Sequence, residues 1–181
     1  IDEEEPDHTV DSTIQAYSAN QHQANHIWRG TKTDIWEAGH RVPFIASWPG
    51  QIEAGSTSAS TICLTDIFAT SMTLAKAKVQ ANTAEDSYSI MPLLLQEGEI
   101  DRPAVVHHSY NGTFAVRSGK WKMVFSDGSG GREEPIGQVF EKPYHLFDLV
   151  VDPSETTNLI DQHPDKAEEL HAILEELISE K

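Results

Sequence analysis

Three short segments with apolar residues at every second position follow one another between residues 104 and 127. Glycine-containing turns, Asn111-Gly112 and Ser118-Gly119, separate them, and such dipeptides are typical of β-hairpins. A fourth segment of the same kind occupies residues 144–152. An amphipathic helix is predicted from His163-Pro164 to the C-terminus, because its apolar residues recur every three or four positions. Residues 101–181 are therefore predicted to form a four-stranded antiparallel sheet with a C-terminal helix.

The first hundred residues follow a different pattern, that of an α/β domain. The mostly apolar run 41–48 ends at Pro49-Gly50 and predicts a buried strand of an α/β sheet. Helical spacing predicts a helix over 64–78, with Thr65 or Asp66 as its N-cap. A single helical turn is predicted near residues 92–95. We thus expect two parts, 1–100 and 101–181.

Composition excludes several classes of function. The net charge of −16 argues against binding to nucleic acid or to anionic membrane surfaces. One cysteine, Cys63, excludes an internal disulfide and any cysteine-based zinc cage, and its apolar neighbours predict a buried, inert thiol. No apolar run is long enough to span a membrane. The first ten residues do not resemble a signal peptide or a natural start, so the chain reads as beginning within a longer protein.

Lys32 lies in a turn between Gly30 and Gly39, just before the apolar run 41–48. A lysine ammonium group is a compact charge that can hold a tetrahedral anion, and a nearby glycine lets a ligand approach the backbone. Taken alone, however, a lysine is more often a solvated surface group. The local pattern indicates a possible anion site and no more.

Several other polar residues are candidates for chemistry or for structure. His22, His26 and His40 could donate hydrogen bonds to a substrate oxygen, but they lack a third ligand for a zinc site. Two adjacent histidines, His107 and His108, should point to opposite faces of a strand. The structural expectations are that Glu37 pairs with Arg41 or accepts backbone N–H groups, Asp34 is a solvated charge, Asp66 caps a helix, and 127–135 is a flexible loop.

The stretch RGTKTDIWEAGHRVPFIASWPG, residues 29–50, resembles the second signature region of the sulfatases. It departs from that pattern at Ala38, where glycine is usual; a methyl group there requires a negative φ. Further segments resemble the same family in the same order, and together they cover residues 18–181. They are HQANHIWRG, TICLTDIFAT, EDSYSIMPLL, HHSYNGTFAVRSGKWKMVF and YHLFDLVVDPSETTNLI.

The resemblance implies the last part of an alkaline-phosphatase-like α/β domain, followed by a small antiparallel sheet with a terminal helix. It implies hydrolysis of sulfate esters, carbohydrate or aryl, by a periplasmic or secreted enzyme that uses calcium and formylglycine. Lys32 matches the sulfate-binding lysine, and His22 matches a histidine of the substrate pocket, for which His26 and His40 are weaker candidates.

The nucleophile and the calcium ligands of that family are expected outside this chain. Cys63 is followed by Leu-Thr-Asp and does not match the modification motif. The expected partner is thus the N-terminal part of the sulfatase, without which this chain should be inactive. Two alternatives stay open: a phosphate or phosphonate monoesterase of the same superfamily, and a non-catalytic truncated module.

Overall fold

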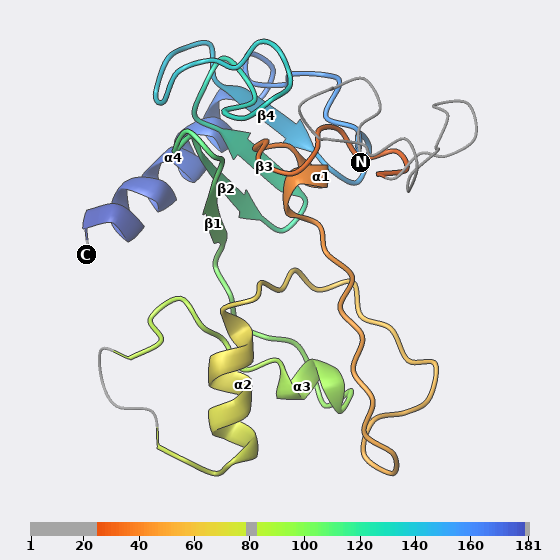
Figure 1. Cartoon of the computed structure of the whole chain (residues 1–181). Helices are drawn as coiled ribbons and strands as arrows, with labels where there is room; N and C mark the ends of the chain where they lie inside the picture. The colour runs from red at the N-terminus through yellow and green to blue at the C-terminus, as the bar shows by residue number, and fades with distance from the viewer. Residues whose placement is uncertain (1–24, 79–82, 180–181) are drawn as a thin grey trace. The chain divides into compact units, whose positions relative to one another are not determined.

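The computed structural model describes residues 25–78 and 83–179 (Figure 1). The chain divides into two compact units, one formed by residues up to Arg41 together with Val106–Lys181, the other by Val42–Val105. The segment that carries Lys32 therefore belongs to the same unit as the C-terminal sheet. The predicted boundary at residue 100 concerns the organisation of the complete protein and stays a prediction.

The predicted four-stranded antiparallel sheet is confirmed. Its strands are neighbours in the order in which they occur along the chain (Figure 1). The second strand pairs antiparallel with the third, with Val116 opposite Met123, and the third pairs antiparallel with the fourth, with Met123 opposite Leu146. The strands are β1 (Val105–His108), β2 (Phe114–Ser118), β3 (Trp121–Val124) and β4 (His145–Asp148).

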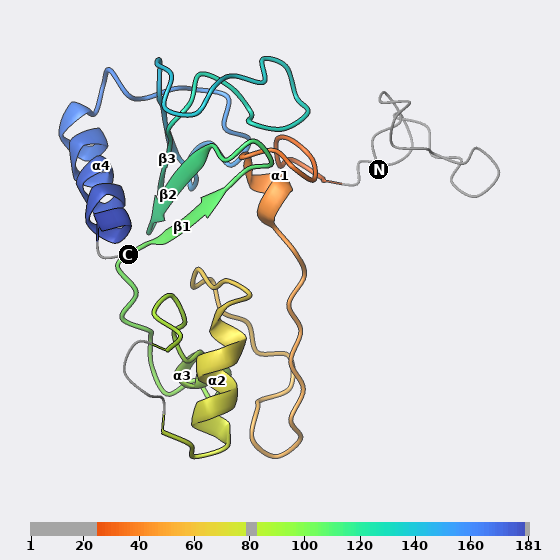
Figure 2. The same cartoon turned by 60° about the vertical axis from the view of Figure 1, so that its left-hand side comes forward.

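The C-terminal helix α4 (Pro164–Ser179) packs against β2 and β3, beside the sheet in Figure 2. Its buried residues are Ala167, Leu170 and Leu174, which belong to the predicted apolar stripe, whereas Ile178 of that stripe is 47% exposed. Each leucine removed from water contributes about 1.5–3 kcal/mol, so this stripe fixes the helix on the sheet.

The core of this unit includes two residues from the lysine-bearing segment. Ile35 and Trp36 are almost fully buried and pack with Phe147 of β4. The Trp36 ring meets the Phe147 ring edge-on, with 6.0 Å between centroids. The segment 31–37 is thus attached to the sheet through hydrophobic contacts, immediately before the short helix α1 (Glu37–His40).

The second unit contains α2 (Asp66–Leu74) and α3 (Met91–Leu94), both close to their predicted positions. Helix α2 is shorter than predicted because Lys76 adopts a left-handed φ of 53° just after its C-cap, Ala75. No helix within 25–78 or 83–179 is long and apolar enough to cross a membrane.

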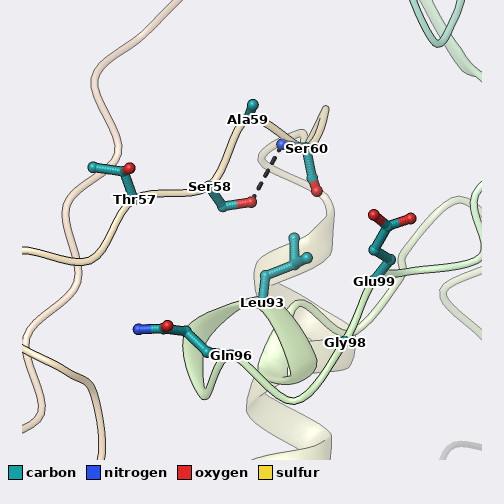
Figure 3. Close-up of a pocket in the computed structure, with 8 residues that line it drawn as sticks. All are labelled: Thr57, Ser58, Ala59, Ser60, Leu93, Gln96, Gly98 and Glu99. Atoms are coloured by element: carbon teal, nitrogen blue, oxygen red, sulfur yellow. Dashed lines mark hydrogen bonds between the residues drawn. The ribbon is translucent and has the colours of Figure 1, made fainter.

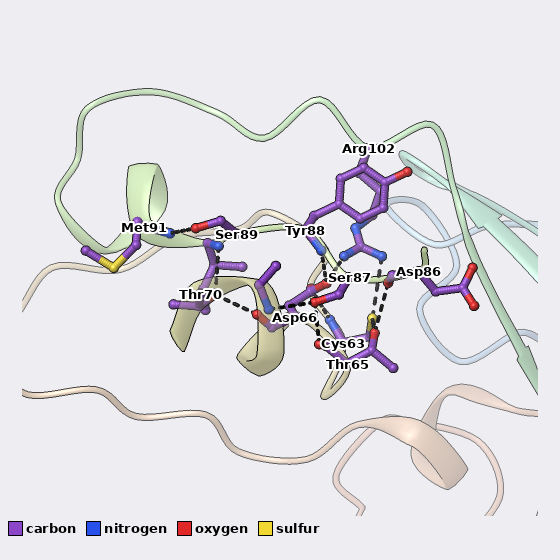
Figure 4. Close-up of polar contacts among 12 residues, drawn as sticks. Cys63, Thr65, Asp66, Thr70, Asp86, Ser87, Tyr88, Ser89, Met91 and Arg102 are labelled. Carbon is purple, nitrogen blue, oxygen red and sulfur yellow. Dashed lines mark hydrogen bonds and ion pairs between the residues drawn. The ribbon is translucent and has the colours of Figure 1, made fainter. Parts of the chain in front are cut away.

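Asp66 is the first residue of α2 and not its N-cap; the N-cap is Thr65, the other predicted candidate, and it forms no side-chain capping hydrogen bond. The buried carboxylate of Asp66 accepts hydrogen bonds from the backbone N–H groups of Cys63 (2.8 Å) and Tyr88 (3.0 Å) and pairs with Arg102 (Figure 4). The prediction that Cys63 is buried among apolar groups is wrong. The thiol is half-buried, with Sγ 2.8 Å from Thr65 Oγ1 and 3.4 Å from a guanidinium nitrogen of Arg102.

The predicted buried strand at 41–48 is also not formed. Residues 41–48 have no regular secondary structure, and their side chains are exposed, up to 91% for Ile45. A strand requires a neighbour that accepts and donates its backbone hydrogen bonds, and among the described residues no strand pairs with this segment. The segment is therefore apolar, as predicted, but the described residues contain no strand with which it could form a sheet.

Candidate functional site

Lys32 is an exposed cation on a loop of otherwise half-buried and buried residues. No described residue forms a hydrogen bond or an ion pair with its ammonium group. Gly39 lets the loop close on itself, because a Cβ atom at this position would lie 2.1 Å from the carbonyl oxygen of Asp34. The loop thus presents an unneutralised positive charge from a tightly folded turn.

Thr33, the residue after Lys32, has an unusual backbone conformation. Its φ is 95°, a region that β-branched residues rarely adopt. Its carbonyl oxygen accepts a hydrogen bond from the N–H of Tyr110 (3.0 Å), and its hydroxyl is buried without a partner among the described residues. Strained residues of this kind persist only where their surroundings hold them, and they gather at functional sites.

The carboxylate of Asp34 fixes the backbone of the Lys32 loop. The prediction that Asp34 is a solvated charge is wrong. Its side chain is fully buried, with one carboxylate oxygen 2.8 Å from the Thr31 nitrogen and the other 2.5 Å from that of Arg132 and 3.2 Å from that of Glu133. Gly131 permits this approach, because a Cβ there would lie 2.4 Å from the carboxylate. The charge is solvated by backbone N–H groups instead of water.

The prediction of a flexible loop at 127–135 is wrong for the same reason. Residues 128–130 are buried. The carbonyl of Ser129 accepts the N–H of Ile35 (2.8 Å), and that of Gly130 accepts the N–H of Asn111 (2.9 Å). Three loops, 31–37, 109–113 and 128–134, are therefore bound to one another through the residues that follow Lys32. Sequence reasoning missed this because the partners lie far apart along the chain.

Glu37 is the first residue of α1 and forms ion pairs with three cationic side chains. Its carboxylate lies 2.9 Å from Arg41, 2.8 Å from Arg117 and 3.2 Å from Lys122. Burial by itself raises the pKa of Glu37, but Lys122, Arg117 and Arg41 together lower it below its ordinary value. The predicted pairing of Glu37 with Arg41 is confirmed, and the other two partners were not foreseen.

Lys122 is a fully buried lysine of β3. Its ammonium group lies 2.8 Å from Glu155 and donates a hydrogen bond to the carbonyl of Ile35 (2.8 Å). Glu155 in turn accepts the N–H of Glu37 at 2.6 Å. Burial raises the pKa of Glu155 more than Lys122 lowers it. A lysine inside an apolar strand and a glutamate inside the segment DPSETTNL were the available signals for this pair.

His40 ends α1, and its ring lies 4.2 Å, centroid to centroid, from that of His107 on β1. His40 is exposed as a residue, but partial loss of hydration of its ring, followed by the positive charge of Lys122, lowers its pKa to about 4. The same two causes hold the pKa of His107 well below its ordinary value, and its Nε2 is buried without a partner among the described residues. Both rings are therefore neutral near pH 7.

The structure does not join the remaining predicted histidines to Lys32. His26 is exposed in the turn 25–27, with a left-handed φ of 54°, and His22 lies outside the described residues. Across 25–78 and 83–179, no hydrogen bond or ring contact links Lys32, His26 and His40. His40 and Lys32 share one continuous segment, whereas a role for His26 stays a prediction.

No group of three or more His, Cys, Asp or Glu side chains in the described part of the chain is arranged to hold a metal ion. The residues that the structure describes thus do not form a calcium site by themselves. Figure 3 shows a pocket of the second unit, and Glu99 is the only charged residue among those that line it. A pocket with this lining has no cation for an anionic substrate. Its residues are Thr57, Ser58, Ala59, Ser60, Leu93, Gln96, Gly98 and Glu99.

Comparison with protein families gives a match over residues 25–181 to the model described as N-sulphoglucosamine sulphohydrolase, C-terminal. The chain is 33% identical to an N-acetylgalactosamine-6-O-sulfatase of Bacteroides thetaiotaomicron, over 86% of its own length and 31% of that protein. It is 31% identical to arylsulfatase A of Homo sapiens, over 84% of its length and 32% of that protein. The chain thus spans about a third of the length of these relatives.

Solved structures give the same result. One from work on glycosaminoglycan metabolism by Bacteroides thetaiotaomicron superposes with a TM-score of 0.76 at 32% identity, covering 87% of this chain and 33% of that one. The PsFucS1 sulfatase from Pseudoalteromonas sp. superposes with a TM-score of 0.70 at 26% identity, covering 84% and 32%. The similarity therefore extends through both the sheet and the preceding segments.

Proposed function

Because the chain belongs to the sulfatase family, as a C-terminal region, we propose that it completes an enzyme that hydrolyses sulfate esters. The family match over 25–181 carries this conclusion. The relatives it resembles bear the names of carbohydrate and aryl sulfatases, which supports a sulfate ester over a phosphate or phosphonate. In the complete enzyme, residues 1–100 would end the catalytic α/β domain, and 101–181 would form its C-terminal subdomain.

Lys32 is the residue of this chain that we assign to the sulfate group. Its exposed ammonium group would bind the non-bridging oxygens of the ester and keep them in place while the sulfur–oxygen bond breaks. A preorganised cation stabilises charge in a transition state because it need not reorient during the reaction. The supporting observation is that Lys32 has no partner among the described residues, although the full chain carries a net charge of −16.

The loop beneath Lys32 supplies the required rigidity. Asp34 is buried and bound by three backbone N–H groups, and Ile35 and Trp36 anchor the loop in the core. These contacts fix the backbone of Lys32, so that only its side-chain torsions remain to be ordered when substrate binds. The neutral ring of His40 would then serve as a hydrogen-bond donor or acceptor for the substrate, with His22 and His26 as further candidates.

The rest of the catalytic machinery would come from the N-terminal part of the polypeptide. We expect a formylglycine hydrate there as nucleophile and a calcium ion as second cation for the sulfate. A sulfated carbohydrate or an aryl sulfate is the proposed substrate, and the periplasm or the cell exterior the proposed location. The isolated chain should consequently show no turnover of an aryl sulfate.

The test is substitution of Lys32 in the complete enzyme. We expect Lys32→Ala to lower kcat/KM for a chromogenic aryl sulfate by about ten- to a thousandfold, the loss typical of one charge-stabilising group. Lys32→Arg should restore only part of the activity, since a planar guanidinium fits a tetrahedral anion differently. The matched control is Lys78→Ala, at another exposed lysine. Unchanged kinetics for Lys32→Ala would remove this residue from the site.

A further inference from the structure

Tyr110 is a large aromatic side chain that is 84% exposed, although its backbone is tightly held. Its N–H donates to the carbonyl oxygen of Thr33 at 3.0 Å. Tyr110 is therefore fixed next to the residue that follows Lys32. The two exposed side chains, one cationic and one aromatic, come from adjoining points of two loops.

The turn that carries Tyr110 is ordered by its own hydrogen bonds. Ser109 donates its N–H to the Thr113 carbonyl (2.9 Å), and the side-chain oxygen of Asn111 accepts the N–H of Thr113 at 3.0 Å. The N–H of Asn111 donates a hydrogen bond to the carbonyl oxygen of Gly130 at 2.9 Å. The backbone of Tyr110 thus has bonded neighbours on both sides, and only the two side-chain torsions of its ring remain to be ordered when a ligand binds.

The Gly-rich loop fits closely beneath this turn. A Cβ at Gly130 would lie 2.1 Å from Ser109 Oγ, so only glycine permits the approach. The same loop binds Asp34 through the N–H groups of Arg132 and Glu133. One buried assembly therefore fixes both Tyr110 and the Lys32 loop, which makes their relative placement reproducible.

A tyrosine ring has an apolar face and a polar edge, and it loses little conformational entropy on binding. A pyranose ring matches it, because the axial C–H groups of a sugar form an apolar face and its hydroxyls a polar rim. We propose that Tyr110 packs against the sugar ring whose sulfate group Lys32 binds, and that it favours sulfated carbohydrates over smaller sulfate esters. This inference rests on the proposed function of Lys32.

The experiment uses the complete enzyme, a sulfated monosaccharide as substrate and inorganic sulfate as a competitive inhibitor. We expect Tyr110→Ala to raise KM for the sugar sulfate about tenfold, the loss of one aromatic contact. The inhibition constant of inorganic sulfate should not change, because that ion has no ring to stack. Tyr110→Phe keeps the ring and should bind the sugar almost as well as the unaltered enzyme.

The controls separate this inference from the proposal for Lys32. Lys32→Ala should weaken the binding of both the sugar sulfate and inorganic sulfate. Val150→Ala, at an exposed apolar residue, should change neither KM nor the inhibition constant. If Tyr110→Ala leaves KM unchanged while Lys32→Ala weakens sulfate binding, only the role of Tyr110 is refuted. If Tyr110→Ala instead lowers the melting temperature and also weakens the binding of inorganic sulfate, the ring packs against protein and the inference is wrong.

Discussion

The ammonium nitrogen of Lys122 lies 2.8 Å from a carboxylate oxygen of Glu155, and both side chains are fully buried. Glu37, the second carboxylate beside this lysine, lies at 3.2 Å and starts the helix that follows the Lys32 loop. One buried cation therefore joins β3, the segment after β4 and α1. The position of the loop depends on this cluster.

Lys122→Met should destabilise the protein severely. Removing one member of a buried ion pair leaves the other charge without compensation, and the usual loss is about 3–5 kcal/mol in the free energy of unfolding. Denaturant unfolding of the complete protein, followed by tryptophan fluorescence, measures this loss. Lys120→Met is the matched control, because Lys120 is half-exposed in its pair with Asp148 and such pairs contribute about 1 kcal/mol or less. Equal losses for the two variants would contradict this account.

The sequence predicted the features that depend on neighbours along the chain. Hairpin turns and period-two runs located the four strands, and the spacing of Leu170 and Leu174 located α4. Lys32 was singled out by its signature segment. Features that depend on distant residues were missed: Asp34 is buried by a loop about a hundred positions away, and the run 41–48 lacks the strand that would pair with it.

Gly39 and Ala38 should differ strongly in their response to the gain or loss of a methyl group. A methyl group at Gly39 would collide with the Asp34 carbonyl at 2.1 Å, so Gly39→Ala should disrupt the Lys32 loop. Ala38 lies within α1 and is not among the residues with positive φ, which confirms that a methyl group is tolerated there. Ala38→Gly should cost only about 1 kcal/mol.

Thermal unfolding and kcat/KM of the two complete variants measure the contrast. We expect Gly39→Ala to lower both, and Ala38→Gly to leave kcat/KM nearly unchanged. The loop geometry would be refuted by a Gly39→Ala enzyme with full activity and an unaltered melting temperature.

The stability of the folded protein should fall as the pH drops below about 6.5. Burial and the charge of Lys122 hold the pKa of His107 well below its ordinary value, and that of His40 at about 4. Below about pH 6.5 the two histidines bind protons in the unfolded chain but stay neutral in the folded chain, so acid favours unfolding. Glu37 adds a loss of the same sign below its ordinary pKa, whereas Glu155, with a raised pKa, acts in the opposite direction.

His107→Gln isolates the histidine contribution. The melting temperature of this variant should depend less steeply on pH between about 6.5 and 4 than that of the unaltered protein. Val106→Ala, the neighbouring position on β1, carries no titrating group and should lower the melting temperature by a similar amount at every pH. Parallel curves for His107→Gln and the unaltered protein would show that His107 is not held neutral by the fold.

The isolated chain should be prone to aggregation because of the segment 41–48. Its apolar side chains are exposed, and its backbone N–H and C=O groups have no partner strand within the described residues. An extended apolar segment of this kind is a template for pairing with another copy. Ile45→Lys should therefore reduce light scattering by the isolated chain at a given concentration. Val151→Lys replaces another highly exposed apolar residue, in a turn outside the segment, and should have less effect. A sharp monomeric melt of the unaltered isolated chain, without scattering, would contradict the prediction.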